Sequence, residues 1–309
     1  GKGCGIGGHR GEVTVTITGG TVEAVAANQF AAIGGEGSVT ITGGVINAAG
    51  KNNAAGIGSN GDIRITGGEI TVSAEGLGAA IGGYAGVDCG NITIQGNVIK
   101  SVISSGAGAC IGGASNRSAG SITISNAKLP PLNGTSLIGW IRGNTAGSLT
   151  IRNCYIESTD TAAGSGIQVS DNGNIRIENS EVKLPEKRDI RAGDGGSIVI
   201  RDSTIHSNGI YMLGNLNEAK NLKRLEITGS TVVTAGNVIG AMGSRASVDE
   251  IVIHGSSLSP AEGADHYYAI GGGEYASFGS IDIQGSQINI PLASNGAAIG
   301  GGNYATYSG

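Results

Sequence analysis

The chain has 309 residues, a formal net charge of −5 and 59 glycines, with two Phe and one Trp. The glycines do not recur at every third position, and the chain has only five prolines, so a collagen triple helix is excluded. Hydrophobic residues make up 39% of the chain, too many for a disordered segment, and most are small or β-branched residues that suit strands. The lack of basic runs argues against nucleic acid as a partner. The sequence has no apolar stretch of membrane-spanning length, so membrane insertion is not predicted.

The first strand of a repeat is predicted by a tripeptide with alternating apolar residues, which recurs eleven times at steps of 23 to 30 residues. The copies are Val15–Ile17, Val39–Ile41, Ile63–Ile65, Ile92–Ile94, Ile122–Ile124, Leu149–Ile151, Ile175–Ile177, Ile198–Ile200, Leu225–Ile227, Ile251–Ile253 and Ile281–Ile283.

Each copy is followed by a second short strand and then by a third, often written Ala-Ala-Ile-Gly-Gly. The third strands are centred on Ile6, Ile33, Ile57, Ile81, Ile111, Ile138, Ile167, Ile190, Ile210, Ile239, Ile270 and Ile299. A coil of three short strands cannot bury its own apolar face, so successive coils must stack with like residues about 4.8 Å apart. The sequence therefore predicts an all-β fold, a single-stranded right-handed parallel β-helix of about eleven three-strand coils, as one domain over residues 1–309.

One corner of the coil is marked by a residue that tolerates positive φ, two positions after the last apolar residue of the first strand. The residues at this position are Gly19, Gly43, Gly67, Gly96, Asn126, Asn153, Asn179, Asp202, Gly229, Gly255 and Gly285. We expect a left-handed backbone at all of them and a hydrogen-bonded ladder of the stacked Asn side chains.

This corner and its Asn ladder resemble those of the pectate-lyase-like family of right-handed β-helices. By that resemblance, the third strand lies in the sheet whose outer face carries the active site in those enzymes. The Ala-Ala-Ile-Gly-Gly coils also resemble repeats of secreted surface proteins of Gram-positive bacteria. The Thr-Ile-Thr-Gly-Gly strands resemble the β-helical carbohydrate-binding modules of clostridia. These resemblances imply an extracellular protein, either secreted or attached to the cell surface.

The chain begins inside one third strand and ends just after another, so we expect its caps either to be absent or to belong to neighbouring domains of a longer chain. The four cysteines fit no metal-binding spacing and favour free, packed thiols, with a disulfide as the alternative.

The third sheet is predicted to present a flat outer face, because small residues such as Ala32, Gly34, Ala80 and Gly82 flank its central isoleucines. The central coils depart from this rule, and such departures are typical of functional positions. The departing residues are Gln168, Asp189, Arg191 and Tyr211.

The turn that follows the third strand places Arg142, Asp171 and Asp194 at the same position of three successive coils. If they are in register, the two carboxylates lie close enough to disfavour joint ionisation, as in a catalytic pair. They are also candidate ligands of a calcium ion, the one cofactor considered. Trp140 and Tyr211 flank this set and are candidates for stacking on sugar rings, and ordinary hydrated turn residues are the competing interpretation.

Tyr275 and the other tyrosines near the C-terminal end form a second aromatic patch, which suits either a sugar platform or contact with a following domain. The sequence contains neither the Asn-Thr-Asp, Asp-Asp and Gly-His-Gly set of polygalacturonases nor the pectate-lyase Trp-Ile-Asp-His pattern.

Three hypotheses follow. The first is a module that binds a polysaccharide on the flat third sheet. The second is a polysaccharide lyase or glycoside hydrolase with its site near residues 140–211, where Asp171, Asp194, Asp189 and Arg191 carry catalysis and Arg191 serves as a lyase base. The third is a purely structural stalk.

Overall fold

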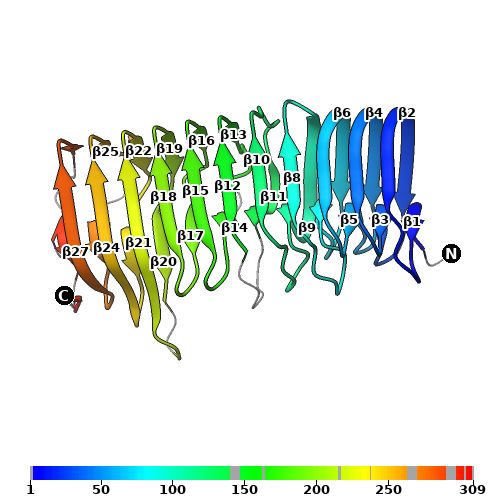
Figure 1. Cartoon of the computed structure of the whole chain (residues 1–309). Helices are drawn as coiled ribbons and strands as arrows, with labels where there is room; N and C mark the ends of the chain where they lie inside the picture. Colours follow the sequence, from blue (N-terminus) through cyan, green and yellow to red (C-terminus); the bar gives the residue numbers. More distant parts are fainter. Residues whose placement is uncertain are drawn as a thin grey trace. The chain divides into compact units, whose positions relative to one another are not determined.

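The structure, a computed structural model, describes residues 3–139, 147–161, 164–214, 217–236, 238–262, 270–289, 297–302 and 304–307. All the regular secondary structure in these ranges is β-strand, and they contain no helix that could cross a membrane. The chain divides into two compact units, Gly1–Ser165 and Gly166–Gly309, so the single domain over residues 1–309 stays a prediction. Within each unit, the strands run side by side in successive coils (Figure 1).

In the first unit, each coil begins with a strand that contains the predicted tripeptide, and the strands pair in parallel. These strands are β2 (Val15–Ala26), β4 (Val39–Gly50), β6 (Ile63–Ala74), β8 (Ile92–Gln95), β10 (Ile122–Ser125) and β12 (Leu149–Arg152). In β2, β4 and β6 the predicted first and second strands form one continuous strand of twelve residues. The alternation of apolar and polar residues buries one face of each strand and exposes the other.

The third strands of the first unit stack their central isoleucines in one interior column. These strands are β1 (Ile6–Gly8), β3 (Ala31–Gly35), β5 (Ala55–Ser59), β7 (Ile81–Gly82), β9 (Ile99–Gly112) and β11 (Asn133–Gly139), and β13 (Tyr155–Glu157) is a separate second strand. Ile33, Ile57, Ile81, Ile111 and Ile138 pair in register and are fully buried. The predicted period therefore places residues of neighbouring coils in contact.

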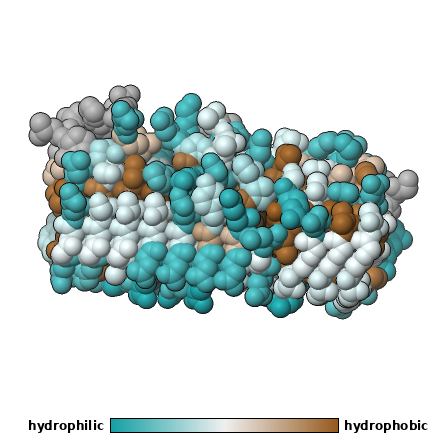
Figure 2. Space-filling view, turned by 90° about the horizontal axis from the view of Figure 1, so that it is seen from above, coloured by the Kyte–Doolittle hydropathy of each residue, from teal (hydrophilic) through white to brown (hydrophobic). Residues whose placement is uncertain are grey.

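The second unit repeats the arrangement with three separate strands per coil. The first strands are β15 (Asn174–Glu178), β18 (Ser197–Arg201), β21 (Lys220–Thr228), β24 (Ala246–His254) and β27 (Ser277–Gln284), with β30 (Thr306–Tyr307) paired to β27. The second strands are β16 (Glu181–Lys183), β19 (Thr204–Ser207), β22 (Thr231–Thr234), β25 (Ser257–Pro260) and β28 (Gln287–Ile288). The third strands are β14 (Gly164–Gln168), β17 (Arg188–Ala192), β20 (Ile210–Leu213), β23 (Ile239–Met242), β26 (Ile270–Gly272) and β29 (Ile299–Gly301). Figure 2 views the structure from above, where pale and hydrophilic residues recur in rows from coil to coil.

The predicted corner is confirmed from Gly96 onward and is wrong by one residue in the first three coils. Asn126, Asn153 and Asn179 have φ between +46° and +53°, and the Asn153 side chain donates to Asn126 Oδ1 at 2.9 Å, as the ladder requires. In the first three coils the positive φ belongs to the second glycine of each pair, at Gly20, Gly44 and Gly68. Both glycines of each pair lie within the continuous strands, but Gly19, Gly43 and Gly67 do not have a positive φ.

The flat Gly/Ala-rich face predicted for the third sheet is wrong for the first unit, because these residues are buried. Ala32 and Ala80 are fully buried. The Ala79 amide donates to the Gly83 carbonyl at 2.9 Å, so the segment curls around its isoleucine rather than lying flat. Tyr84 from the following turn packs over the small residues of neighbouring third strands. Gly34 has a φ of +116°, and a Cβ there would lie 2.0 Å from the Gly58 carbonyl oxygen. The absence of a side chain at Gly34 therefore allows neighbouring coils to stack closely.

Candidate functional site

Asp171 and Asp194 lie together as predicted, and their carboxylates bond to backbone amides of the next coil. Asp171 Oδ1 accepts from the Asp194 amide at 2.9 Å, and Asp194 Oδ1 accepts from the Asn221 amide at 2.6 Å. Lys220 Nζ lies 3.2 Å from Asp171 Oδ1, with Asp171 partly exposed. These contacts hold successive turns in register. Asp residues in turns commonly have this structural role, because their carboxylates bond to backbone amides.

Asp189, Arg191, Gln168 and Tyr211 form one polar cluster across three third strands. Tyr211 donates to Asp189 Oδ2 at 2.7 Å, and Asn208 donates to Asp189 Oδ1 at 3.0 Å. Arg191 Nη2 donates to Gln168 Oε1 at 3.3 Å, with Arg191 Nε 4.0 Å from Asp189 Oδ2. The cluster is therefore cross-linked internally.

Tyr211 is only 2% exposed, so its predicted use as an open stacking surface for sugars is wrong. Burial, followed by the charge of Asp189, raises the pKa of the phenol above its ordinary value. Its hydroxyl donates to the buried Asp189 carboxylate, a pairing that satisfies both buried groups.

Trp140 and Arg142 lie outside the described residues. In the described ranges, no group of three or more His, Cys, Asp or Glu side chains is placed to hold a metal ion. The role of Asp171 and Asp194 as calcium ligands therefore stays a prediction.

A four-residue turn after the third strand recurs along the chain, and its third residue has a positive φ. In each turn the fourth residue donates its amide to the first residue's carbonyl, as Val87 does to Tyr84. Such a position favours Gly, which has no Cβ to clash, and Asn, whose short polar side chain tolerates the left-handed region better than other side chains do. Four turns obey this preference, with Gly86, Asn116, Asn172 and Gly195 at the third position.

Three turns of the second unit break the preference with large side chains. Arg245, Tyr275 and Tyr304 have φ values of +59°, +60° and +58° at the same position of the same turn. Ala246, Ala276 and Ala305 supply the turn amides, donating at 3.1–3.3 Å. Non-Gly residues held at such φ values cost about 1–3 kcal/mol each and cluster at functional sites.

Tyr275 and Tyr304 together form an exposed aromatic surface. Their ring centroids lie 4.9 Å apart with an interplanar angle of 4°, and the residues are 51% and 73% exposed. The pairing of Ser277 with Thr306 places the two turns one coil apart in matching register. The sequence predicts Tyr275 as a ligand-binding residue but does not single out its pairing with Tyr304. The signal is the repeated turn, Gly-Gly-Gly-Glu-Tyr-Ala and Gly-Gly-Gly-Asn-Tyr-Ala.

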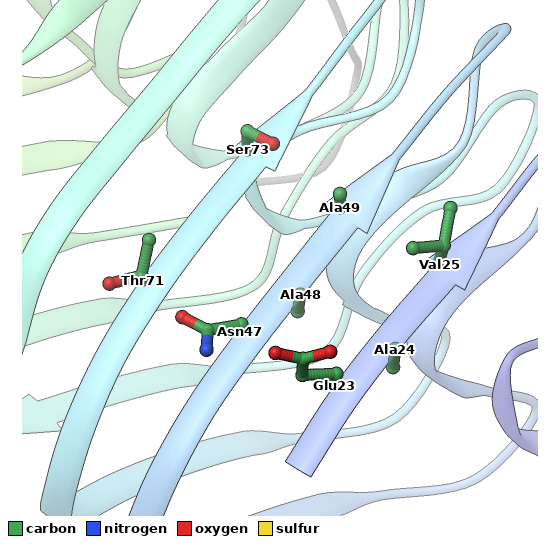
Figure 3. A pocket seen from close by; sticks show the side chains of 8 residues that line it. All are labelled: Glu23, Ala24, Val25, Asn47, Ala48, Ala49, Thr71 and Ser73. Carbon is green, nitrogen blue, oxygen red and sulfur yellow. The ribbon is translucent and has the colours of Figure 1, made fainter.

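The first unit has a hollow of about 200 Å³ on the outer face of β2, β4 and β6. Figure 3 shows two rows of side chains there, one of Glu23, Asn47 and Thr71 and one of Val25, Ala49 and Ser73. This hollow was not predicted from the sequence. Its signal is the small Ala and Ser at outward positions between larger residues.

Comparison with known proteins gives one family. A family model described as a right-handed beta helix region matches residues 86–258, which is more than half of the chain. No curated protein and no solved structure matches the chain.

Proposed function

Because the chain belongs to the right-handed β-helix family, we propose that it uses its stacked coils to bind a polysaccharide, on a platform formed by Tyr275 and Tyr304. The observation that carries the proposal is that two bulky aromatic residues occupy strained turn positions and expose their rings. A fold of repeated coils leaves function to local departures from the repeat, and this is the clearest one.

The chemistry of the rings supports a sugar ligand. Tyrosine offers a flat apolar face and a polar hydroxyl, which suits the apolar C–H face and the hydroxyl edge of a sugar ring. The two rings stack on each other with their centroids 4.9 Å apart, so a sugar ring can stack on an outer face of the pair while its hydroxyls bond to the tyrosine hydroxyls.

The proposal is for binding without catalysis. A polysaccharide lyase or glycoside hydrolase at the central coils is the second candidate, favoured by the adjacency of Asp171 and Asp194. The carboxylates of Asp171, Asp194 and Asp189 all accept hydrogen bonds from their own chain, which favours a structural part for them.

We also propose that the protein acts outside the cell, secreted or attached to the surface, where structural polysaccharides are found. Protease treatment of intact cells tests this. Loss of the protein from treated cells, or its presence in the medium, agrees with the proposal, whereas full protection inside intact cells contradicts it.

A panel of insoluble polysaccharides, scored for retention of the protein and for release of reducing or unsaturated ends, tests the function. We expect retention without product, weakened in Tyr275→Asn and in Tyr304→Asn but unchanged in Asp171→Ala and Asp194→Ala. Product that disappears in the two Asp variants would support the enzyme instead.

The Asn variants also separate function from structure. Asn is one of the residues that the other turns use at this position, so each Tyr→Asn change should maintain or raise stability by up to about 1 kcal/mol. Weaker binding together with an unfolding midpoint at a lower denaturant concentration would show that the tyrosines stabilise the fold rather than bind the ligand.

A further inference from the structure

We propose that the hollow on the outer face of β2, β4 and β6 is a second saccharide site, which binds a neutral sugar chain independently of Tyr275 and Tyr304. Its polar row consists of Glu23, Asn47 and Thr71, which pair in register on three neighbouring strands. At an inter-strand distance of about 4.8 Å, the row is about 10 Å long.

The side chains of this row have hydrogen-bonding capacity to offer a ligand. Glu23, Asn47 and Thr71 are exposed, and their side chains make no hydrogen bond or ion pair with the described residues. Together they supply carboxylate, amide and hydroxyl groups, which can both donate to and accept from sugar hydroxyls.

The second row supplies a floor of small side chains between two apolar walls. Ala49 and Ser73 are small, and they lie in one register column between Val25 and Ile103, which are 60% and 42% exposed. Figure 3 shows Ala49 and Ser73 alongside Val25, next to the polar row. A shallow floor with apolar walls beside a polar edge suits a sugar ring, which has an apolar C–H face and a hydroxyl edge.

The charges around the hollow favour a neutral ligand. Glu23 is the one charged residue among those that line it. The nearby Lys51 and Lys100 are paired with Glu75 at 2.8 Å and with Glu69 at 3.8 Å. A uronate or sulfated sugar would face the Glu23 carboxylate without an unpaired cation to offset the repulsion.

A peptide strand is a poorer occupant. The backbone of β4 pairs with β2 on one side and with β6 on the other, so the floor offers no free ladder for β-strand addition. The ligand must therefore be recognised by side chains alone.

Titration calorimetry with soluble oligosaccharides of glucose, mannose, xylose and galacturonate tests the inference in the Tyr275→Asn/Tyr304→Asn background. We expect residual binding of a neutral oligosaccharide, weakened at least about fivefold by Asn47→Ala and by Ala49→Leu, which fills the hollow. Thr42→Ala, an exposed change elsewhere on β4, is the matched control and should leave the affinity unchanged.

Each alternative result overturns the inference separately from the proposed function. The absence of residual binding in the tyrosine double variant, or binding that Ala49→Leu does not weaken, would contradict the second site without contradicting the platform. Preference for galacturonate over the neutral sugars contradicts the ligand class. Full binding in the tyrosine double variant would instead contradict the platform. The Asn47→Ala and Ala49→Leu variants would then show whether the second site accounts for that binding.

Discussion

Two adjacent glycines form the corner in each of the first three coils, and only the second of each pair has a positive φ. Both Gly19 and Gly20 lie within β2, but only Gly20 has a positive φ, of +81°. The sequence cannot separate two adjacent glycines, because both tolerate either conformation. At Asn126 the neighbouring residues have side chains, and the position is clear from the sequence alone.

Substitution of the two glycines tests the corrected corner. A Cβ at either position meets no atom within 4 Å, so only the backbone conformation differs between them. Gly20→Ala should therefore destabilise the protein by about 1–2 kcal/mol, and Gly19→Ala should change the stability by less than about 0.5 kcal/mol. Urea denaturation measures both, and equal effects would contradict the assignment.

Buried cysteines give the stability a dependence on alkaline pH. All four cysteines are free, as predicted, and Cys89 is buried. Burial, followed by the charge of Asp62, raises the pKa of the Cys89 thiol from 9.0 to about 12. Since the unfolded chain ionises this thiol more readily, stability is full below pH 9 and falls as the pH rises toward 12.

Cys89→Ala should remove that part of the alkaline loss. At about 1.4 kcal/mol per pH unit, the loss between pH 9 and pH 11 is on the order of 3 kcal/mol. Guanidinium denaturation at pH 8 and pH 11 measures the difference for the natural chain and for the variant. The same loss in both chains would show that other groups carry it.

At the scale of elements, a charge network crosses the outer face of β18, β21 and β24. Glu226 is 6% exposed, and it accepts from Arg201 Nε at 2.6 Å and from Arg224 Nε at 3.1 Å. Arg224 also donates to Glu250 of the next strand. The hydrogen bond from Arg201 is the largest cause that holds the pKa of Glu226 below its ordinary 4.5.

Because this pKa is lowered by folding, the stabilisation is present above pH 4.5 and is lost as the pH falls through the folded-state value. Glu226→Gln should cost about 1–3 kcal/mol at pH 7 and flatten the acid side of the stability profile. Thermal unfolding between pH 3 and pH 7 measures both effects. A variant with an unchanged acid slope would show that Glu226 does not contribute to it.

The strands follow from the sequence, but the exposure of the third strand does not. The isoleucine columns depend on a residue period and on alternation, which are local features. The burial of Ala32 and Ala80 accompanies a curled backbone, and Tyr84 from a following turn packs with Ala31 and Ala55. No local sequence pattern predicts either feature. Likewise, the adjacency of Asp171 and Asp194 was predictable, but their bonds to backbone amides depend on turn geometry.

At the scale of the molecule, function depends on positions that stacking makes equivalent. Tyr275 and Tyr304 are 29 residues apart in the chain, and the matching turns bring their rings face to face at 4.9 Å. The same position carries Gly or Asn in four other turns, so the tyrosines are a departure from the repeat rather than a part of it.

A double-mutant cycle on Tyr275 and Tyr304 tests most directly whether the stacked pair binds the oligosaccharide. The dissociation constant of the retained oligosaccharide is measured for the natural chain, Tyr275→Asn, Tyr304→Asn and the double variant. We predict that each single change weakens binding about tenfold and that the double change weakens it by less than the product of the two, because the rings act as one surface. Binding that is unchanged in all three variants would contradict the platform.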